Sequence, residues 1–193
     1  MSIADFDIVI QPGWQDSSAE HWQSRWQQAW PDTVRVAHGN WDTPELPRWL
    51  DGLDAALAAC RKPALVVAHS LGCVTVAHHV RRGGRPIAGA LLVAPADVER
   101  SGVPAALAGF APIPAAALPF PAILVASDDD PYCPLDRAEA LAGAWRTDLV
   151  RIGKAGHINA ASGLGDWAQG RVLLELLART VGGAGPARSG KIR

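Results

Sequence analysis

The sequence contains little cysteine, little net charge and no long apolar run, and each shortage narrows what the protein can be. Its 193 residues include three cysteines and carry a formal net charge of −1. Cys60, Cys73 and Cys133 are scattered along the chain, so they form neither a metal-binding spacing nor an evident disulfide framework. A chain with so little net charge also lacks the clustered basic face that nucleic-acid binding needs. We therefore expect neither a metal centre nor a nucleic-acid partner.

The apolar residues are distributed in short runs. No stretch approaches the roughly 20 apolar residues that a membrane-spanning helix requires. The N-terminus has no basic region followed by a long apolar run, which is the pattern of a signal peptide. We therefore expect no membrane association and a reducing, cytoplasmic location.

The length and composition suit one globular domain. Apolar residues make up 49% of the chain and charged residues 19%, and no internal repeat is visible. A chain of this length buries roughly 70% of its unfolded surface in a single fold. We expect that domain to span residues 1–181. Residues 182–193 are rich in glycine and basic side chains, and we expect them to form a flexible tail.

The most informative stretch is residues 64–74, with the sequence ALVVAHSLGCV. A short apolar, β-branched run ends at Ser70, and a run compatible with a helix follows at once. This is the pattern of a nucleophile elbow, a tight strand-turn-helix in which the serine sits at the apex. Positions two before and two after the serine must be small; Gly72 fits, whereas Ala68 replaces the more usual glycine. The alternative is a buried strand followed by an ordinary serine helix cap.

Strand and helix patterns alternate along the whole chain. Strands are expected at residues 6–11, 33–37, 64–69, 87–93, 123–126 and 148–152, and helices at residues 18–30, 44–60, 71–82, 135–145 and 166–181. The first helix would begin at a capping box formed by Ser17 and Glu20, and the second would carry Pro44 in its first turn. This alternation favours an α/β fold, with a parallel sheet of about six strands covered by helices on both faces.

Two helices show which side they should bury. Trp22, Trp26 and Trp30 share one face of the first helix, which indicates core packing. In the last helix, the residues expected to face inward are Val172, Leu173, Leu176 and Leu177. The irregular segment 94–121 contains a short helical candidate near residues 104–108. It either forms a small cap over the functional site or makes a surface excursion without contact to it, and the sequence leaves both open.

Three polar residues follow strands of the expected sheet. Ser70 follows the third, Asp130 the fifth and His157 the sixth. In parallel sheets the chemistry gathers beyond the carboxyl ends of the strands, and Ser, Asp, His is the chain order of an α/β-hydrolase triad. We therefore predict Ser70 as nucleophile, His157 as general base and acid, and Asp130 as the carboxylate that orients the imidazole.

The acid of this triad has rivals. Asp128 and Asp129 adjoin Asp130, and Asp97 follows the fourth strand. We favour Asp130 because it sits in the DPYCP stretch, where the proline four residues on begins the next helix. Neighbouring carboxylates repel one another, which raises pKa values. Asp128 and Asp129 are therefore expected to point away or to accept hydrogen bonds from the backbone.

An acyl transfer to Ser70 also needs donors for the developing oxyanion. We predict the backbone N–H of Leu71, directly after the nucleophile, and the backbone N–H of Trp14, in the loop after the first strand. No metal ion or organic cofactor is required by this chemistry.

Other residues are weaker candidates. His69 precedes the nucleophile and should point away from the Ser70 hydroxyl; His21, His38, His78 and His79 are expected at the surface or in helix packing. Asn159, Ser162 and Trp167 either shape the pocket or fix the loop after His157, and these alternatives stay open. Cys73 is expected to be a free core thiol.

Several strings extend this interpretation. PGWQDSSAEHW, AHSLGC, LPFPA, SDDDPY and GHINAASGLGDW resemble the small serine hydrolases of the retinoblastoma-binding protein 9 and YdeN family, from about residue 8 to residue 177. The resemblance implies a minimal, three-layer α/β-hydrolase fold with strand order 2-1-3-4-5-6 and no large cap. It also implies hydrolase activity, with the triad on Ser70, Asp130 and His157. Ala68, where many relatives carry glycine, is a departure.

Three functions follow from these observations. The first is a serine hydrolase, esterase-like, acting on a small ester, thioester or amide. The second is an acyltransferase or perhydrolase-like enzyme on the same fold, which depends on access of water to the acyl-enzyme. The third is a protein-binding module with an idle triad, although no linear partner motif stands out. The expected partner is thus a small acyl substrate.

Overall fold

A six-stranded parallel sheet forms the centre of the structure, a computed structural model that describes residues 1–30 and 32–183. Its order is β2-β1-β3-β4-β5-β6, and every neighbouring pair is parallel. The strands are β1 (Asp7–Gln11), β2 (Val34–Arg35), β3 (Ala64–His69), β4 (Gly89–Val93), β5 (Ala122–Ala126) and β6 (Asp148–Arg151). The predicted fold class and strand order are confirmed.

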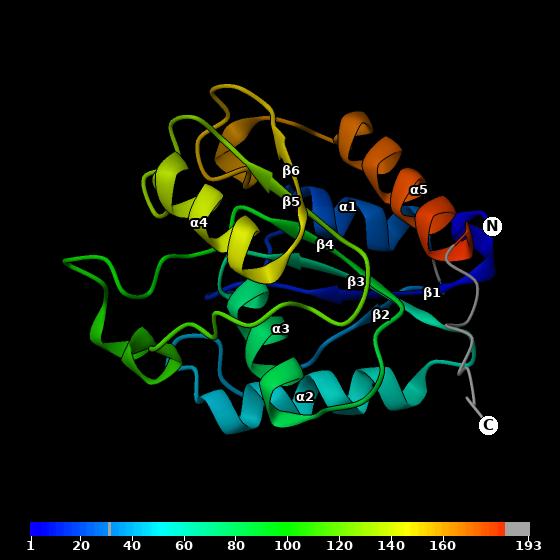
Figure 1. Ribbon diagram of the computed structural model, residues 1–193, viewed down its shortest axis with the longest axis horizontal. Coiled ribbons are helices and arrows are strands. Elements are labelled where there is room, and N and C mark those ends of the chain that lie inside the picture. Colours follow the sequence, from blue (N-terminus) through cyan, green and yellow to red (C-terminus); the bar gives the residue numbers. More distant parts are fainter. Residues whose placement is uncertain (31, 184–193) are drawn as a thin grey trace, which may run out of the picture.

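Helices cover both faces of this sheet (Figure 1). They are α1 (Trp22–Ala29), α2 (Leu46–Ala59), α3 (Leu71–Arg82), α4 (Leu135–Trp145) and α5 (Ala168–Gly183), with short 3-10 turns η1 (Ile3–Asp5), η2 (Ala105–Phe110) and η3 (Ala160–Ser162). Helices α2, α3 and α4 contribute to one core, and α1 and α5 contribute to the other. All six residues of β3 are buried because this strand is covered on both faces.

The tryptophans fill these two cores. Trp22 and Trp26 of α1 are fully buried on one face of the sheet, and Trp49 and Trp145 are fully buried on the other. The predicted core role of the α1 tryptophans is confirmed for Trp22 and Trp26, and Trp30 is partly buried against the same cluster. Large aromatic side chains contribute strongly to such packing because they bury so much apolar area.

The starts of two helices differ from the prediction. Helix α1 begins at Trp22 and is capped by the His21 side chain, which accepts a hydrogen bond from the Gln23 N–H. Before it, Gln15 and Asp16 have positive φ, and the turned chain leaves the Ser17 hydroxyl donating to the Gln23 side chain at 2.7 Å instead of capping. Helix α2 begins at Leu46, later than predicted. The proline in its first turn is therefore Pro47 and not the predicted Pro44.

The buried face of α5 also differs from the prediction. Val172 and Leu176 are 67% and 53% exposed, whereas Leu174 and Leu177 are buried. The apolar residues of this helix form two adjacent stripes, and the sheet covers only one of them. Helix α5 continues to Gly183, two residues into the predicted tail. The remainder of that tail, residues 184–193, lies outside the described residues.

The long connection between β4 and β5 extends beyond the left end of the sheet in Figure 1. Within it, Leu107 and Phe110 of η2 are buried. The ring of His78, on α3, donates from Nε2 to the Phe110 carbonyl at 2.8 Å. The segment is therefore packed against the domain.

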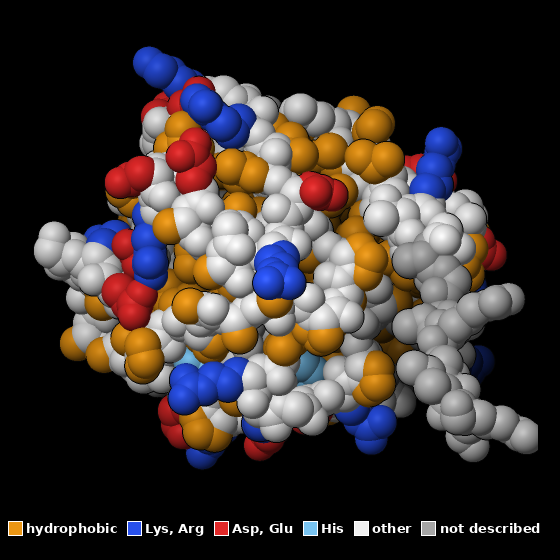
Figure 2. Space-filling view, viewed as in Figure 1, with side chains coloured by type: hydrophobic (Ala, Val, Ile, Leu, Met, Phe, Trp, Pro, Cys, Tyr) orange, Lys and Arg blue, Asp and Glu red, His pale blue; other side chains and the backbone are white. Residues whose placement is uncertain are grey.

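Charged side chains of both signs lie beside one another along the left edge of the face shown in Figure 2. Ion pairs among the described residues include those of Arg137 with Asp97 and Glu99. Over the described parts of the chain, no helix is both long enough and apolar enough to cross a bilayer.

Candidate active site

Ser70 occupies a strained turn between β3 and α3. Its φ of 55° and ψ of −122° lie outside the ordinary regions for a non-glycine residue. The turn is fixed by the Ser70 N–H, which donates to the Val93 carbonyl at 3.0 Å. The sequence thus predicts this strand-turn-helix correctly, including the bounds of α3.

Two glycines allow the loop after β1 to approach the turn closely. A Cβ at Gly72 would lie 2.5 Å from the Gln11 carbonyl oxygen and 2.6 Å from that of Pro12. A Cβ at Gly13 would lie 2.7 Å from the Cβ of Ser70. Any larger residue at these two positions would push the loop away from the serine. Gly13 is a residue of the site that is not predicted from the sequence.

The Ser70 hydroxyl, the His157 imidazole and the Asp130 carboxylate form one hydrogen-bonded chain. The distance from Ser70 Oγ to His157 Nε2 is 2.8 Å. His157 Nδ1 lies 2.9 and 2.8 Å from the two oxygens of Asp130. An ionised carboxylate can only accept, so Nδ1 carries the proton and Nε2 is left free to accept from the serine. The three predicted residues are therefore together, in the order that proton transfer requires.

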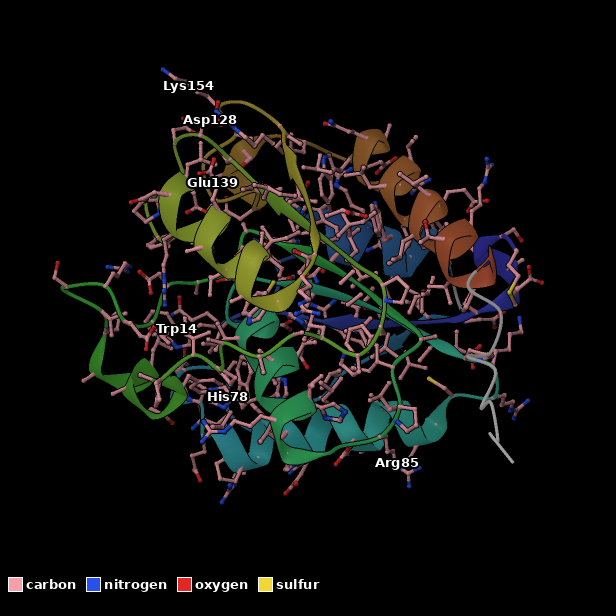
Figure 3. The ribbon with its side chains drawn as sticks, viewed as in Figure 1. Trp14, His78, Arg85, Asp128, Glu139 and Lys154 are labelled. Atoms are coloured by element: carbon pink, nitrogen blue, oxygen red, sulfur yellow. The ribbon has the colours of Figure 1, made fainter. Side chains whose placement is uncertain are left out.

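The neighbouring carboxylates have other partners. Asp129 accepts from the Ser127 hydroxyl and from the Gly156 N–H, and these bonds lower the pKa of its carboxyl. Asp128 pairs with Arg151 at 3.0 Å. Figure 3 places Asp128, with Trp14, at the left side of the molecule, where β1 and β5 end. Asp130 alone of these carboxylates contacts the imidazole.

The remaining rival, Asp97, lines the pocket but lies 3.3 Å from Arg137. It also accepts from the Glu99 N–H. Arg137, which lies on α4, thus compensates part of the charge of Asp97. No hydrogen bond joins it to His157 among the described residues.

The loop that carries His157 is held by α1. Trp22 donates from Nε1 to the Ile158 carbonyl at 2.8 Å, and Trp26 donates from Nε1 to the Asp166 carbonyl at 2.8 Å. Ile158 itself is fully buried with a φ of 48°, which is unusual for a β-branched residue. The tryptophans of α1 thus contribute to the core and also position the histidine loop.

The residues that follow His157 have different roles. The Ser162 hydroxyl bridges the Ala155 carbonyl and the Asn159 N–H, so it fixes the loop. Trp167 is buried against Trp22 and Trp26. Asn159 both lines the pocket and caps η3 through its side chain.

Leu71 and Trp14, the predicted oxyanion donors, both line the pocket beside Ser70. Among the described residues, neither backbone N–H donates a hydrogen bond outside regular helix or strand pairing. The Trp14 ring is anchored separately, by a bond of 2.9 Å from Nε1 to the Asp42 carbonyl. Their role as oxyanion donors stays a prediction.

Two further histidines adjoin the site. His69 and His21 are buried, line the pocket and lie with their rings 4.8 Å apart. Burial lowers the pKa of His21 to about 4 and holds the pKa of His69 well below its usual range, with the nearby His157 acting in the same direction. Both rings are therefore neutral at pH 7. The prediction from the sequence is that His21 lies at the surface or in helix packing. No local sequence pattern indicates that the loop before α1 reaches the site.

The pocket itself is small, with a volume of about 220 Å³. One wall comes from the loop after β1 and includes Trp14, Asp16 and His21. Another part of the lining comes from the connection between β4 and β5, through Val98, Arg100, Val103, Pro104 and Leu107. Of the two alternatives for segment 94–121, the structure therefore supports a cover over the site.

The other histidines and the cysteines make packing or hydrogen-bond contacts outside the triad. The His38 ring stacks on Trp49 with centroids 4.0 Å apart, and His79 bonds to the Arg85 carbonyl. Figure 3 shows His78 on α3. Cys73 and Cys133 are buried and free, and burial raises the pKa of both thiols, to about 12 for Cys133. Among residues 1–30 and 32–183, no three His, Cys, Asp or Glu side chains are grouped so as to hold a metal ion.

Comparison with known proteins gives the family and the fold. Residues 8–176 match the serine hydrolase family. A putative YdeN-like hydrolase from Pectobacterium atrosepticum is 35% identical, with a TM-score of 0.83 over 92% of this chain and 93% of that one. The ydeN gene product from B. subtilis is 19% identical, with a TM-score of 0.73 over 90% and 99% of the two chains.

A more distant likeness is to a thermophilic esterase from Thermogutta terrifontis. It is 15% identical, with a TM-score of 0.64 over 91% of this chain and 90% of that one. At such low identity this similarity, like that to the B. subtilis protein, shows the fold alone. A comparison with curated proteins gave no match.

Proposed function

Because the chain belongs to the serine hydrolase family, we propose that it cleaves a small ester, thioester or amide through an acyl-enzyme formed on Ser70. The observation that carries the proposal is the hydrogen-bonded chain from Ser70 through His157 to Asp130, which opens into the pocket. A simple carboxylic ester is the substrate class that we put first, since the pocket is small and partly apolar.

The first step is attack by the Ser70 hydroxyl on the substrate carbonyl. A serine hydroxyl is a poor nucleophile at neutral pH, so a base must take its proton during the attack. His157 Nε2 lies 2.8 Å from Oγ and accepts this proton. The imidazolium that forms is stabilised by the Asp130 carboxylate at Nδ1, and the Asp130 oxygen Oδ1 is itself held by the Tyr132 N–H at 2.9 Å.

The tetrahedral intermediate carries a negative oxygen, which the N–H groups of Leu71 and Trp14 stabilise. Donors already in place cost no reorganisation during the reaction. The imidazolium then gives its proton to the leaving group, which departs and leaves the acyl group on Ser70. Water, deprotonated by His157, attacks this ester, and its cleavage returns the serine to its starting state.

The remaining parts of the proposal concern partners and location. We propose that no metal or organic cofactor takes part, that the substrate is a free small molecule and that the protein acts in the cytoplasm. The support for a reducing compartment is that Cys60, Cys73 and Cys133 are all free thiols.

The proposal is tested by rapid-mixing kinetics with p-nitrophenyl acetate. The protein should release a burst of p-nitrophenol equal in amount to the enzyme, and Ser70→Ala should lower turnover by about 10³-fold or more. His157→Ala should lower it similarly because the two groups act as a unit. Ser101→Ala, in an exposed turn, serves as the matched control.

Three results would overturn the proposal in different ways. Turnover that survives Ser70→Ala would place the chemistry elsewhere. No turnover of any small ester, thioester or amide by the unmodified protein would favour a binding module with an idle triad. A slow hydrolysis that an added alcohol accelerates, with transfer of the acyl group to that alcohol, would identify an acyltransferase.

A further inference from the structure

We propose that the site selects substrates that carry an anionic group, such as a carboxylate, and that Arg100 binds this group. The proposal rests on the proposed hydrolase function and specifies its substrate class. Its starting point is the charge balance of the pocket lining, in which one cation has no acidic partner among residues 1–30 and 32–183.

The two acidic residues of the pocket lining each pair with an arginine. Asp16 forms an ion pair with Arg35, and Asp97 lies 3.3 Å from Arg137. His21 and His69 are buried and neutral. Each of the two acidic residues in the lining therefore has an arginine partner, and Arg137 also pairs with Glu99. An anionic substrate thus meets carboxylates that are already ion-paired.

Arg100 differs from the other charged side chains of the lining. It lines the pocket, yet none of the described carboxylates lies within ion-pair distance of it. The one described hydrogen bond of its side chain is from Nη1 to the Ser101 carbonyl at 3.3 Å. A guanidinium has several N–H donors in a planar fork that matches a carboxylate, so most of its donors remain available.

The position of Arg100 relates it to the reacting groups. Its Cζ lies over the Tyr132 ring, 5.4 Å from the centroid. The same ring meets the His157 imidazole edge-on, with centroids 4.6 Å apart. One aromatic ring thus separates the free cation from the base. A substrate that spans this distance would place its carboxylate on Arg100 and its scissile carbonyl beside Ser70.

The apolar side chains next to Arg100 strengthen the case. Val98, Val103, Pro104 and Leu107 come from the same connection and line the same wall. A carboxylate bound there is partly removed from water, which makes a charge-assisted hydrogen bond stronger than at an open surface. The wall fits a short methylene chain that ends in an anion.

The test uses pairs of esters that differ in charge but hardly in shape. The first pair is the mono-p-nitrophenyl ester of adipic acid and the p-nitrophenyl ester of adipamic acid, in which a primary amide replaces the carboxylate. The second pair, 4-acetoxybenzoate and 4-acetoxybenzamide, carries the same difference on the leaving group. In at least one pair, kcat/KM for the carboxylate should exceed that for the amide by about tenfold. The preference should shrink as salt is added.

Substitutions of Arg100 test whether this residue causes the preference for the carboxylate. Arg100→Gln should remove the preference through a higher KM for the carboxylate, so that kcat/KM becomes equal for the two members of a pair. Arg100→Lys should keep part of it, since the charge remains but the planar fork is lost. Arg48→Gln, an exposed arginine outside the pocket lining, is the matched control and should change neither value.

The outcomes separate this proposal from the proposed function. Ser70-dependent turnover with equal kcat/KM within both pairs, or a preference that survives Arg100→Gln, overturns the role of Arg100 but leaves the hydrolase intact. If no ester is turned over, calorimetry with adipate and adipamide decides instead. Tighter binding of adipate that Arg100→Gln abolishes supports the anion site without hydrolysis, and equal binding of the two compounds overturns it.

Discussion

His69 and His157 lie 88 residues apart in the chain and are joined by a hydrogen bond of 2.9 Å, from His69 Nε2 to the main-chain oxygen of His157. A carbonyl oxygen can only accept, so the His69 ring carries its proton on Nε2. The residue before the nucleophile therefore holds the backbone of the residue that acts on the nucleophile. This bond links the end of β3 directly to the loop after β6.

The first prediction concerns this link. His69→Leu should lower kcat for p-nitrophenyl acetate by about tenfold with little change in KM, because the imidazole of His157 loses its exact position relative to Ser70. His69→Gln, which keeps a donor, should recover part of the loss. His79→Leu is the matched control, since His79 also bonds to a carbonyl, that of Arg85, but is not among the residues that line the pocket. Equal losses in the two leucine variants would contradict the positioning role.

The second prediction concerns the acid of the triad. Asp130→Asn should lower kcat by roughly 10³- to 10⁴-fold, because an amide cannot stabilise the imidazolium and can favour the wrong tautomer of His157. Asp128→Asn should stay within about twofold, since Asp128 pairs with Arg151 at a partly exposed position. The measurement is the steady-state rate with p-nitrophenyl acetate. The opposite ranking of the two variants would move the acid to Asp128.

The third prediction concerns the small residues around the serine. Gly72→Ala should cost roughly 2 kcal/mol of unfolding free energy and most of the activity, because its Cβ would meet two carbonyl oxygens of the loop that carries Trp14. Ala68→Gly, which restores the more usual glycine, should cost about 1 kcal/mol and leave kcat almost unchanged. Urea denaturation and ester hydrolysis, measured on both variants, provide the comparison. A large rise in kcat for Ala68→Gly would show that the alanine limits catalysis.

The strands and the residues at their carboxyl ends follow closely from the sequence, whereas the surroundings of the site do not. The turn at Ser70 is specified locally, by a buried strand, small neighbours and a helix that starts at once. Asp130 and His157 follow from their positions after strands, since parallel strands bring their carboxyl ends to one edge.

The predictions that are wrong concern features that depend on contacts without a local sequence pattern. The start of α1 depends on the positive φ of Gln15 and Asp16 and on a cap by His21, which has no local pattern. The buried side of α5 depends on which of two apolar stripes the sheet covers. The contacts of His21 and Arg100 with the pocket arise only when loops distant in the sequence meet, so no spacing indicates them.

The fourth prediction concerns stability at acid pH. Burial lowers the pKa of His21 and of His38 to about 4, from an ordinary value of 6.5. The unfolded chain binds protons at pH values where these folded rings do not, so stability is full above pH 6.5 and falls as pH drops toward 4. Each ring contributes on the order of 2 kcal/mol to this loss.

Urea denaturation at several pH values between 7 and 4.5 measures the effect. The unfolding free energy should decline across this range, and His38→Gln should make the decline shallower whatever its effect on stability at pH 7. His38 suits this experiment because its Nε2 accepts from the Gln11 amide at 2.9 Å, which requires a neutral ring. An identical slope in the variant and the unmodified protein would show that His38 is not held neutral by the fold.

The central claim is that Ser70 is activated by His157, and covalent labelling tests it most directly. A fluorophosphonate reacts with an activated serine and leaves a stable adduct. Mass spectrometry of the treated protein should show one adduct, mapped to Ser70, with no labelling of Ser70→Ala and strongly slowed labelling of His157→Ala. An unmodified mass after prolonged treatment, or an adduct on another residue, would contradict the account.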